Sequence, residues 1–178
     1  MESKQGIDPR FPIGDFDLDV ALRAKKREEM IETIRDLPSA IESAVEGLSE
    51  AQLDEPYRDG GWTIRQVVHH VADSHINSFS RFKLALTEDL PTIRAYFEDK
   101  WAELPDSKGS VGNSLDIIRG VHARWAEMLS SMDESDFSRR LNHPETGEWD
   151  LKGMLALYDW HSRHHTAHIT SLRKRKGW

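Results

Sequence analysis

The sequence contains no cysteine. This absence excludes disulfides, metal sites built from thiolates, and a thiol of the protein acting as a nucleophile. Any sulfur chemistry would have to come from a substrate. Against this background nine histidines and six tryptophans stand out, and the histidines occur in clusters.

Long apolar runs are also missing. Residues 1–20 hold no apolar run of signal-peptide length, and the longest apolar stretch, Met154–Tyr158, is far shorter than the about 20 residues that a membrane span needs. Acidic side chains outnumber basic ones and give a net charge of −7, which argues against a broad electrostatic grip on nucleic acid or an anionic membrane. The sequence therefore predicts a cytoplasmic protein with neither nucleic acid nor a membrane as partner.

The chain of 178 residues has the length of one domain. No repeat or linker divides it, so residues 1–178 are predicted to form a single domain, with residues 1–19 as an extended N-terminal arm. Apolar residues recur every three or four positions in four segments, which is typical of amphipathic helices. The predicted fold is all-α, a four-helix bundle, with a long loop over residues 87–112 and a small hairpin around residues 139–151.

Capping and breaking residues set the expected bounds of the first two helices. The first helix is predicted from about Val20 to Gly47, and Pro38 within it is expected to kink the helix rather than divide it, because proline removes an amide donor. The second helix begins after Thr63, which has the spacing of a capping box with Gln66. It ends before Pro91.

The last two helices have similar signals. Asn113 and Ser114 mark the predicted entry of the third helix. The fourth is predicted to run from about Asp150, a suitable N-cap, to Lys176, where Gly177 is a natural stop.

The fourth helix carries the densest group of histidines. Helical periodicity places one set of residues on a single face: Met154, Tyr158, His161, His165, Ile169 and Leu172. Because His161 and His165 are four positions apart, their rings project from successive turns and can reach one ion. Core histidines would each need a polar partner, whereas one cation satisfies them together, so a metal site is favoured. The pair His164 and His168 has the same spacing but a poorer orientation.

A third ligand has to come from another segment, and the second helix offers three histidines. His75 lies centrally in the apolar stripe, whereas His70 and His69 lie at its two borders. Periodicity alone therefore favours His75. His122 of the third helix is also on an apolar stripe and is interpreted as a packing residue or as a hydrogen-bonding support for a ligand.

Familiar hydrolase signatures are absent. The run His161–His165 has no glutamate after its first histidine, so it is not a zincin helix, and no phosphate-binding loop or nucleophile elbow is present. The basic run Arg173–Lys176 is more simply explained by the dipole at the end of a helix than by nucleic-acid binding.

Three segments in order carry a family resemblance: Phe11–Gly14, Tyr57–Thr63 leading into His69 and His70, and Trp160–His165. Together they resemble the YfiT branch of the DinB-like superfamily. The resemblance covers nearly the whole chain, including the order and lengths of the four helices. It implies a bundle that holds one divalent metal ion per subunit, Zn²⁺ or Ni²⁺, through three histidines.

The resemblance also implies which histidines bind the metal. Carried onto this chain, the ligands are His70 from the second helix and His161 and His165 from the fourth. The first of these overrides the preference of periodicity for His75, on the expectation that the second helix tilts enough to bring its border inward. Many DinB-like proteins have a glutamine at the position of His168, so an extra ligand, a supporting donor and a substrate contact all stay open there.

The activity implied by the resemblance is metal-dependent hydrolysis, or the transfer of a low-molecular-weight thiol, bacillithiol, to an electrophile. Both need a free coordination position at which the ion binds water or a thiol and lowers its pKa. Structural zinc sites are usually closed by four ligands, so a three-histidine site favours chemistry. No catalytic residue is assigned, but five residues are candidates for orienting a ligand or a small-molecule substrate: Asp73, Asn77, Arg94, Tyr96 and His164.

The resemblance further implies a homodimer. Two other classes of function remain open. One is a metal-binding or small-molecule-binding protein of a stress response that has no catalytic activity. The other is a bundle that holds haem, which would give the purified protein a Soret band.

Overall fold

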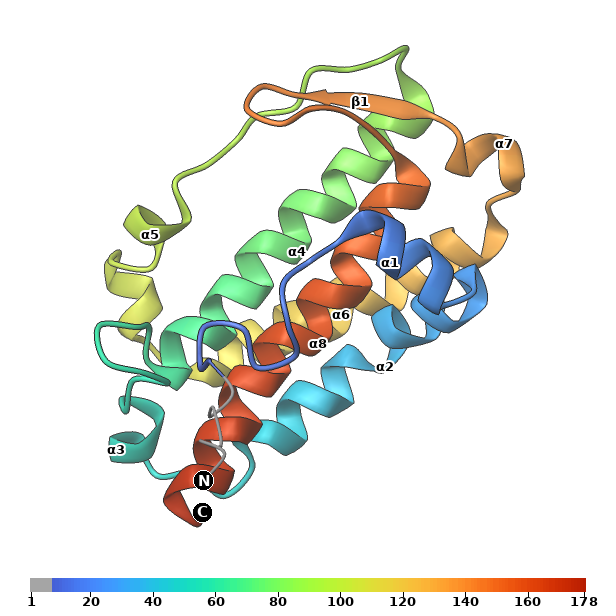
Figure 1. The fold of residues 1–178 in the computed structure, drawn as a ribbon. Coiled ribbons are helices and arrows are strands. Elements are labelled where there is room, and N and C mark those ends of the chain that lie inside the picture. Colours follow the sequence, from blue (N-terminus) through green and yellow to red (C-terminus); the bar gives the residue numbers. More distant parts are fainter. Residues whose placement is uncertain (1–7) are drawn as a thin grey trace.

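The computed structural model describes residues 8–178 and consists mainly of helices. Four of them are long and form the predicted four-helix bundle (Figure 1). The elements in chain order are α1 (Leu18–Ala24), α2 (Arg27–Val45), α3 (Glu50–Leu53), α4 (Ile64–Thr87), α5 (Glu98–Trp101), the 3-10 turn η1 (Pro105–Lys108), α6 (Val111–Ser131), α7 (Glu134–Phe137), β1 (Arg140–His143), β2 (Gly147–Asp150) and α8 (Leu151–Lys176). Within residues 8–178 no helix is long and apolar enough to cross a membrane.

Each long helix packs mainly on two others. Helix α2 lies against α6 and α8, and α4 lies against the same two helices. Helices α2 and α4 are therefore diagonal to each other in the bundle, as are α6 and α8. This arrangement brings α4 beside α8, the two helices that carry most of the histidines.

The core consists of two apolar clusters. One surrounds Trp125 and Phe82, and the other surrounds Val68 and Ile169. Between them, along α4, α6 and α8, lies a layer of histidines: His75, His122, His161 and His165. A buried layer of this kind is costly unless its polar atoms find partners, so the contacts of these histidines decide what the layer can do.

The ends of α4 and α8 follow the capping chemistry of the sequence. The Thr63 side chain accepts a hydrogen bond from the backbone N–H of Gln66, and the Gln66 side chain accepts one in return from the Thr63 backbone. The Asp150 side chain accepts from the backbone N–H of Gly153, and Gly177 ends α8 with φ of 73°. The predicted starts of both helices and the end of α8 are confirmed.

The first predicted helix is wrong in one respect. The segment Val20–Gly47 forms two helices, α1 and α2, because the backbone is extended at Lys25 and Lys26. The break lets α1 pack on α8 and lets the Lys25 Nζ reach a carboxylate oxygen of Asp159 at 2.7 Å. Pro38 does not divide the helix, as expected, since α2 continues past it to Val45.

Two other boundaries also differ from the prediction. Helix α6 begins after Ser110 rather than at Asn113, because the Ser110 side chain accepts from the backbone N–H of Gly112 and caps the helix. The predicted arm over residues 1–19 ends at Asp17, which caps α1, and its residues 1–7 lie outside the described part of the chain. Residues 8–17 run along α8 (Figure 1).

The hairpin lies over one end of the bundle, and the long loop starts beside it and runs back along α4 to the start of that helix (Figure 1). Strands β1 and β2 form an antiparallel hairpin in the expected region. The long loop contains α5 and η1. Its residue Ile93 is buried and donates a backbone hydrogen bond to the carbonyl of Asn142 in β1. The loop and the hairpin are thus joined above α4 (Figure 1).

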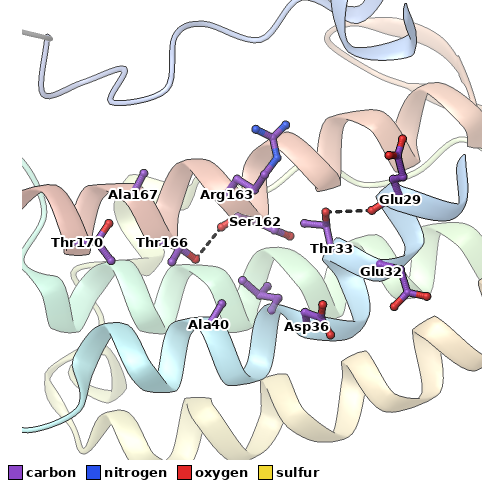
Figure 2. Close-up of a pocket in the computed structure, with 11 residues that line it drawn as sticks. Glu29, Glu32, Thr33, Asp36, Ala40, Ser162, Arg163, Thr166, Ala167 and Thr170 are labelled. Atoms are coloured by element: carbon purple, nitrogen blue, oxygen red, sulfur yellow. Dashed lines mark hydrogen bonds between the residues drawn. The ribbon is translucent and has the colours of Figure 1, made fainter. Parts of the chain in front are cut away.

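A groove of about 390 Å³ lies between α2 and α8 (Figure 2). Figure 2 shows that its hydroxyl groups turn back onto their own helices: Thr166 donates to the carbonyl of Ser162 and Thr33 to that of Glu29. Among the described residues that line this groove there is no histidine. It is therefore separate from the histidine layer.

A buried carboxylate ties α8 to the break between α1 and α2. Asp159 is 1% exposed and pairs with Lys25 and Arg163, each at 2.7 Å. Burial raises the pKa of this carboxyl group, but hydrogen bonds from Arg163 and Lys25 outweigh it and hold the pKa below the ordinary value of 3.8. The folded state therefore favours the charged form of Asp159.

We expect Asp159→Asn to lower the free energy of unfolding at pH 7 by about 1.5–3 kcal/mol, the size of one hydrogen bond to a charged group. A carboxyl group whose pKa is lowered by folding stabilises the protein above its unfolded pKa, and this contribution is lost as pH falls through the folded pKa. The difference between Asp159→Asn and the unmodified protein should thus shrink in acid. Urea unfolding of both proteins at pH 7 and in acid measures it, and an equal difference at both pH values would contradict this account.

Candidate metal centre

The structure brings together the three histidines that the resemblance implied. His70 lies on α4, and His161 and His165 lie on successive turns of α8. One ring nitrogen from each residue lies within 4.8 Å of the other two, and the Nε2 atoms of His70 and His161 are 3.3 Å apart. Two nitrogens bound to one tetrahedral zinc ion at about 2.0–2.1 Å are themselves about 3.3 Å apart. The spacing and the donor type therefore fit a single divalent ion.

The three imidazoles are held in the neutral form. Burial lowers the pKa of His70 to about 4, and burial together with the neighbouring imidazoles lowers the pKa of His161 and His165 well below the ordinary value of 6.5. A neutral imidazole is the form that binds a metal, because its second nitrogen keeps a free lone pair.

The other histidines of α4 point elsewhere. His75, which periodicity favoured, is completely buried and lies behind His161, with its Nε2 atom 3.0 Å from the Nδ1 atom of His161. His69 makes a hydrogen bond of 2.7 Å with the hydroxyl of Ser114 on α6. Of these three residues, only His70 lies in the three-nitrogen group.

His164 lies beside the group without belonging to it. Its ring stacks on the indole of Trp160 with centroids 4.1 Å apart. The ring of Phe11 in the arm lies farther away, with its centroid 6.3 Å from that of His164. Among the described residues the buried Nδ1 atom of His164 has no hydrogen-bond partner. This histidine is thus part of an aromatic contact between α8 and the arm.

His168 supports one of the three histidines from outside. Its Nδ1 atom is 3.4 Å from the Nδ1 atom of His165, and its Nε2 atom is 3.1 Å from the carbonyl oxygen of Arg10. Tyr57 stacks on its ring at 4.0 Å. His168 therefore lies outside the three-nitrogen group and links His165 to the arm.

A pocket of about 370 Å³ opens on the three histidines. Trp62 lies against the His70 ring at 4.6 Å. On another side the hydroxyls of Ser74 and Tyr158 are 3.1 Å apart. The pocket thus combines a histidine floor, an aromatic wall and hydroxyl groups that can hydrogen-bond a small molecule.

Two further residues of this pocket escaped the sequence analysis. Arg81 lines it, is 9% exposed, and donates to the carbonyl of Arg94 at 3.0 Å. Its position next to Phe82 did not mark Arg81, because adjacent positions of a helix face different sides. His143 also lines the pocket, but it comes from the hairpin and no periodicity marks it.

Three of the five proposed orienting residues line one or both of two neighbouring pockets. Tyr96 lines both the histidine pocket and a neighbouring pocket of about 440 Å³, and Asn77 and Arg94 line only the second. Asp73 lies on the same side of α4, and its backbone carbonyl accepts from the Asn77 side chain at 2.8 Å. Burial raises the pKa of the Asp73 carboxyl group to about 6.

The chain is similar to a known family over most of its length. Residues 33–169, more than half of the chain, match the DinB superfamily. A protein from Bacillus cereus strain 03BB102 and one from Bacillus thuringiensis subsp. konkukian are each 54% identical over 171 residues, which cover 96% of this chain and 99% of theirs. Both are named "Putative metal-dependent hydrolase".

Solved structures give the same result for the fold. YfiT from Bacillus subtilis, described as a probable metal-dependent hydrolase with an unusual four-helix bundle topology, matches with a TM-score of 0.91 at 44% identity, over 97% of this chain and 99% of YfiT. The four-helix bundle protein TT2238 matches with a TM-score of 0.54 at 19% identity, over 84% of this chain and 99% of TT2238, a likeness in fold alone.

Proposed function

The chain belongs to the DinB superfamily, and on that premise we propose that it is a metal-dependent hydrolase whose ion is held by His70, His161 and His165. The observation that carries the proposal is the convergence of three neutral ring nitrogens within 4.8 Å at the floor of an open pocket. A divalent cation held only by three imidazoles keeps a free coordination position, where it lowers the pKa of water or a thiol towards neutrality. We propose Zn²⁺ or Ni²⁺ as the ion, because imidazole suits both.

The residues of the chain supply binding and orientation. Trp62 covers one side of the His70 ring and offers an apolar surface to a substrate. The guanidinium of Arg81 lines the pocket and can bind a carbonyl or carboxylate oxygen. The hydroxyls of Ser74 and Tyr158 form a pair on a further side that can accept or donate a hydrogen bond.

Transfer of a low-molecular-weight thiol, such as bacillithiol, to an electrophile is the second candidate. It is favoured by the absence of cysteine, because no thiol of the protein competes for the free position. The third candidate is a metal-binding or small-molecule-binding protein without catalytic activity. The homodimer and the cytoplasmic location stay predictions.

The test of the proposed function is turnover by protein loaded with zinc or nickel. We expect the loaded protein to consume at least one member of a panel of esters and amides, or a thiol paired with an epoxide or haloaromatic compound. Chelation should bring the rate to background, and readdition of the ion should restore it. A protein that binds the metal but turns over nothing in the panel would favour the binding function instead.

A further inference from the structure

Three histidines, two of them completely buried, form a continuous series of hydrogen bonds behind the candidate metal centre. The Nδ1 atom of His161 is 3.0 Å from Nε2 of His75. The Nδ1 atom of His75 is 2.8 Å from Nε2 of His122. The Nδ1 atom of His122 is 2.5 Å from the backbone carbonyl oxygen of Ile34. The chain takes one residue from each of α8, α4, α6 and α2, so all four long helices meet in it.

The carbonyl at its end fixes the direction of every bond in this chain. A carbonyl oxygen can only accept, so the Nδ1 atom of His122 donates to Ile34. A neutral imidazole has one N–H group, and the Nε2 atom of His122 must then accept from Nδ1 of His75. By the same rule Nε2 of His75 accepts from Nδ1 of His161. The Nε2 atom of His161 is left with a free lone pair, and this is the atom that faces His70 at 3.3 Å.

We propose that His75 and His122 are positioning residues that hold His161 in its Nδ1-protonated tautomer, with Nε2 directed at the metal. This inference rests on the proposed metal site. It also accounts for both residues that helical periodicity singled out and the three-nitrogen group did not absorb. His75 cannot be a ligand in this arrangement, because each of its ring nitrogens already faces another histidine.

Burial strengthens the hydrogen bonds between these histidines. His75 and His122 are both 0% exposed, so water does not compete for their hydrogen bonds, and an imidazole that lost its partner there would pay a desolvation cost. A ring flip or a change of tautomer at His161 would break the bond to His75 and then leave an unpaired group inside the core. The ligand ring is therefore fixed before any ion arrives.

A second, shorter series of hydrogen bonds, with the same donor-to-acceptor direction, orients His165. The Nε2 atom of His168 lies 3.1 Å from the carbonyl oxygen of Arg10 and donates to it. Its Nδ1 atom then accepts from Nδ1 of His165 at 3.4 Å. Both candidate ligands on α8 are thus Nδ1-protonated, His165 through one further histidine and His161 through two, and each series of hydrogen bonds ends on a backbone carbonyl.

The first experiment measures the tautomers directly in the metal-free protein. Nitrogen-15 NMR of the histidine side chains distinguishes a protonated Nδ1 atom from a protonated Nε2 atom in each ring. We expect His161, His75 and His122 all to carry the proton on Nδ1. Finding His161 protonated on Nε2 would overturn the proposal. This readout is independent of whether any substrate is turned over, so its failure is distinct from a failure of the proposed function.

The second experiment replaces His122, the last histidine of the hydrogen-bonded series, and measures zinc affinity by competition with a chelator. His122→Phe keeps a planar ring but removes the acceptor for His75, and we expect the dissociation constant for zinc to rise about 10–100-fold, the usual effect of losing an outer hydrogen-bond partner of a ligand. His122→Gln keeps an amide that can accept and should restore most of the affinity.

A matched control uses the same substitution at another buried histidine. His69→Phe alters α4 next to His70, but His69 does not belong to the hydrogen-bonded series of histidines, since it bonds to Ser114. It should leave the affinity for zinc near that of the unmodified protein. Equal losses in His69→Phe and His122→Phe would indicate general damage to the bundle and overturn the positioning role. If His122→Phe does not fold, His122→Gln and the tautomers decide: Nδ1 protonation of His161 maintained in His122→Gln supports the proposal, and its loss contradicts it.

Discussion

His161→Ala and His165→Ala are expected to weaken zinc binding by more than the about 10–100-fold that the loss of an outer hydrogen-bond partner costs a metal site. Each substitution removes one of the three nitrogens that converge within 4.8 Å, and two imidazoles cannot hold an ion as three do. His70→Ala should have the same effect from the other helix. Elemental analysis after gel filtration measures the zinc retained, and far-ultraviolet circular dichroism verifies that the helices persist.

The control for the ligand variants is His164→Ala. This residue is next to His165 on α8, but its ring stacks on Trp160 and lies outside the three-nitrogen group. It should keep its zinc. Full zinc content in His70→Ala would instead return His75 to the ligand set and contradict the proposed site.

Trp125→Ala is expected to lower the free energy of unfolding by about 3–5 kcal/mol, the usual cost of truncating a large buried aromatic side chain. Trp125 is 0% exposed and its ring contacts those of Phe82 and Tyr158, with centroids 5.4 and 5.5 Å away. The cavity left behind would adjoin His122, whose ring centroid is 5.7 Å from that of Trp125. Urea unfolding of the metal-free protein measures the loss.

Trp125→Phe separates packing from the indole N–H group. Among the described residues the Nε1 atom of Trp125 has no hydrogen-bond partner, so phenylalanine removes an unpaired polar group while it keeps most of the ring contacts. We expect a clearly smaller loss than with alanine. Equal losses in the two variants would show that packing around this ring does not carry the stability.

The fold could be predicted where the sequence contains local chemistry. The capping box of Thr63 and Gln66, the N-cap Asp150 and the stop at Gly177 all act within a few positions, and each lies where it was expected. The break at Lys25 could not be predicted in this way. Its partner, Asp159, is 134 positions away, and helical periodicity cannot predict a contact at that separation.

The site shows the same division between local and distant information. Periodicity identified the face of α8 that carries His161 and His165, because spacing along one helix is local. It ranked His75 above His70, since the centre of an apolar stripe is the most buried position. The structure shows why that ranking misleads: the centre of the stripe faces the core, whereas the pocket opens at its border, where His70 lies. The three-residue chain through His122 depends on how four helices meet.

The residues that form the histidine site lie far apart in the sequence, and this separation determines when during synthesis the site can form. His70 precedes His161 by 91 positions, and Arg10 precedes His168 by 158. A ribosome therefore releases α4 and the arm long before α8 exists for them to pack against. In the proposed site, metal binding by all three histidines can consequently occur only after the synthesis of α8, because a nascent chain that stalls before α8 carries only His70 of the three.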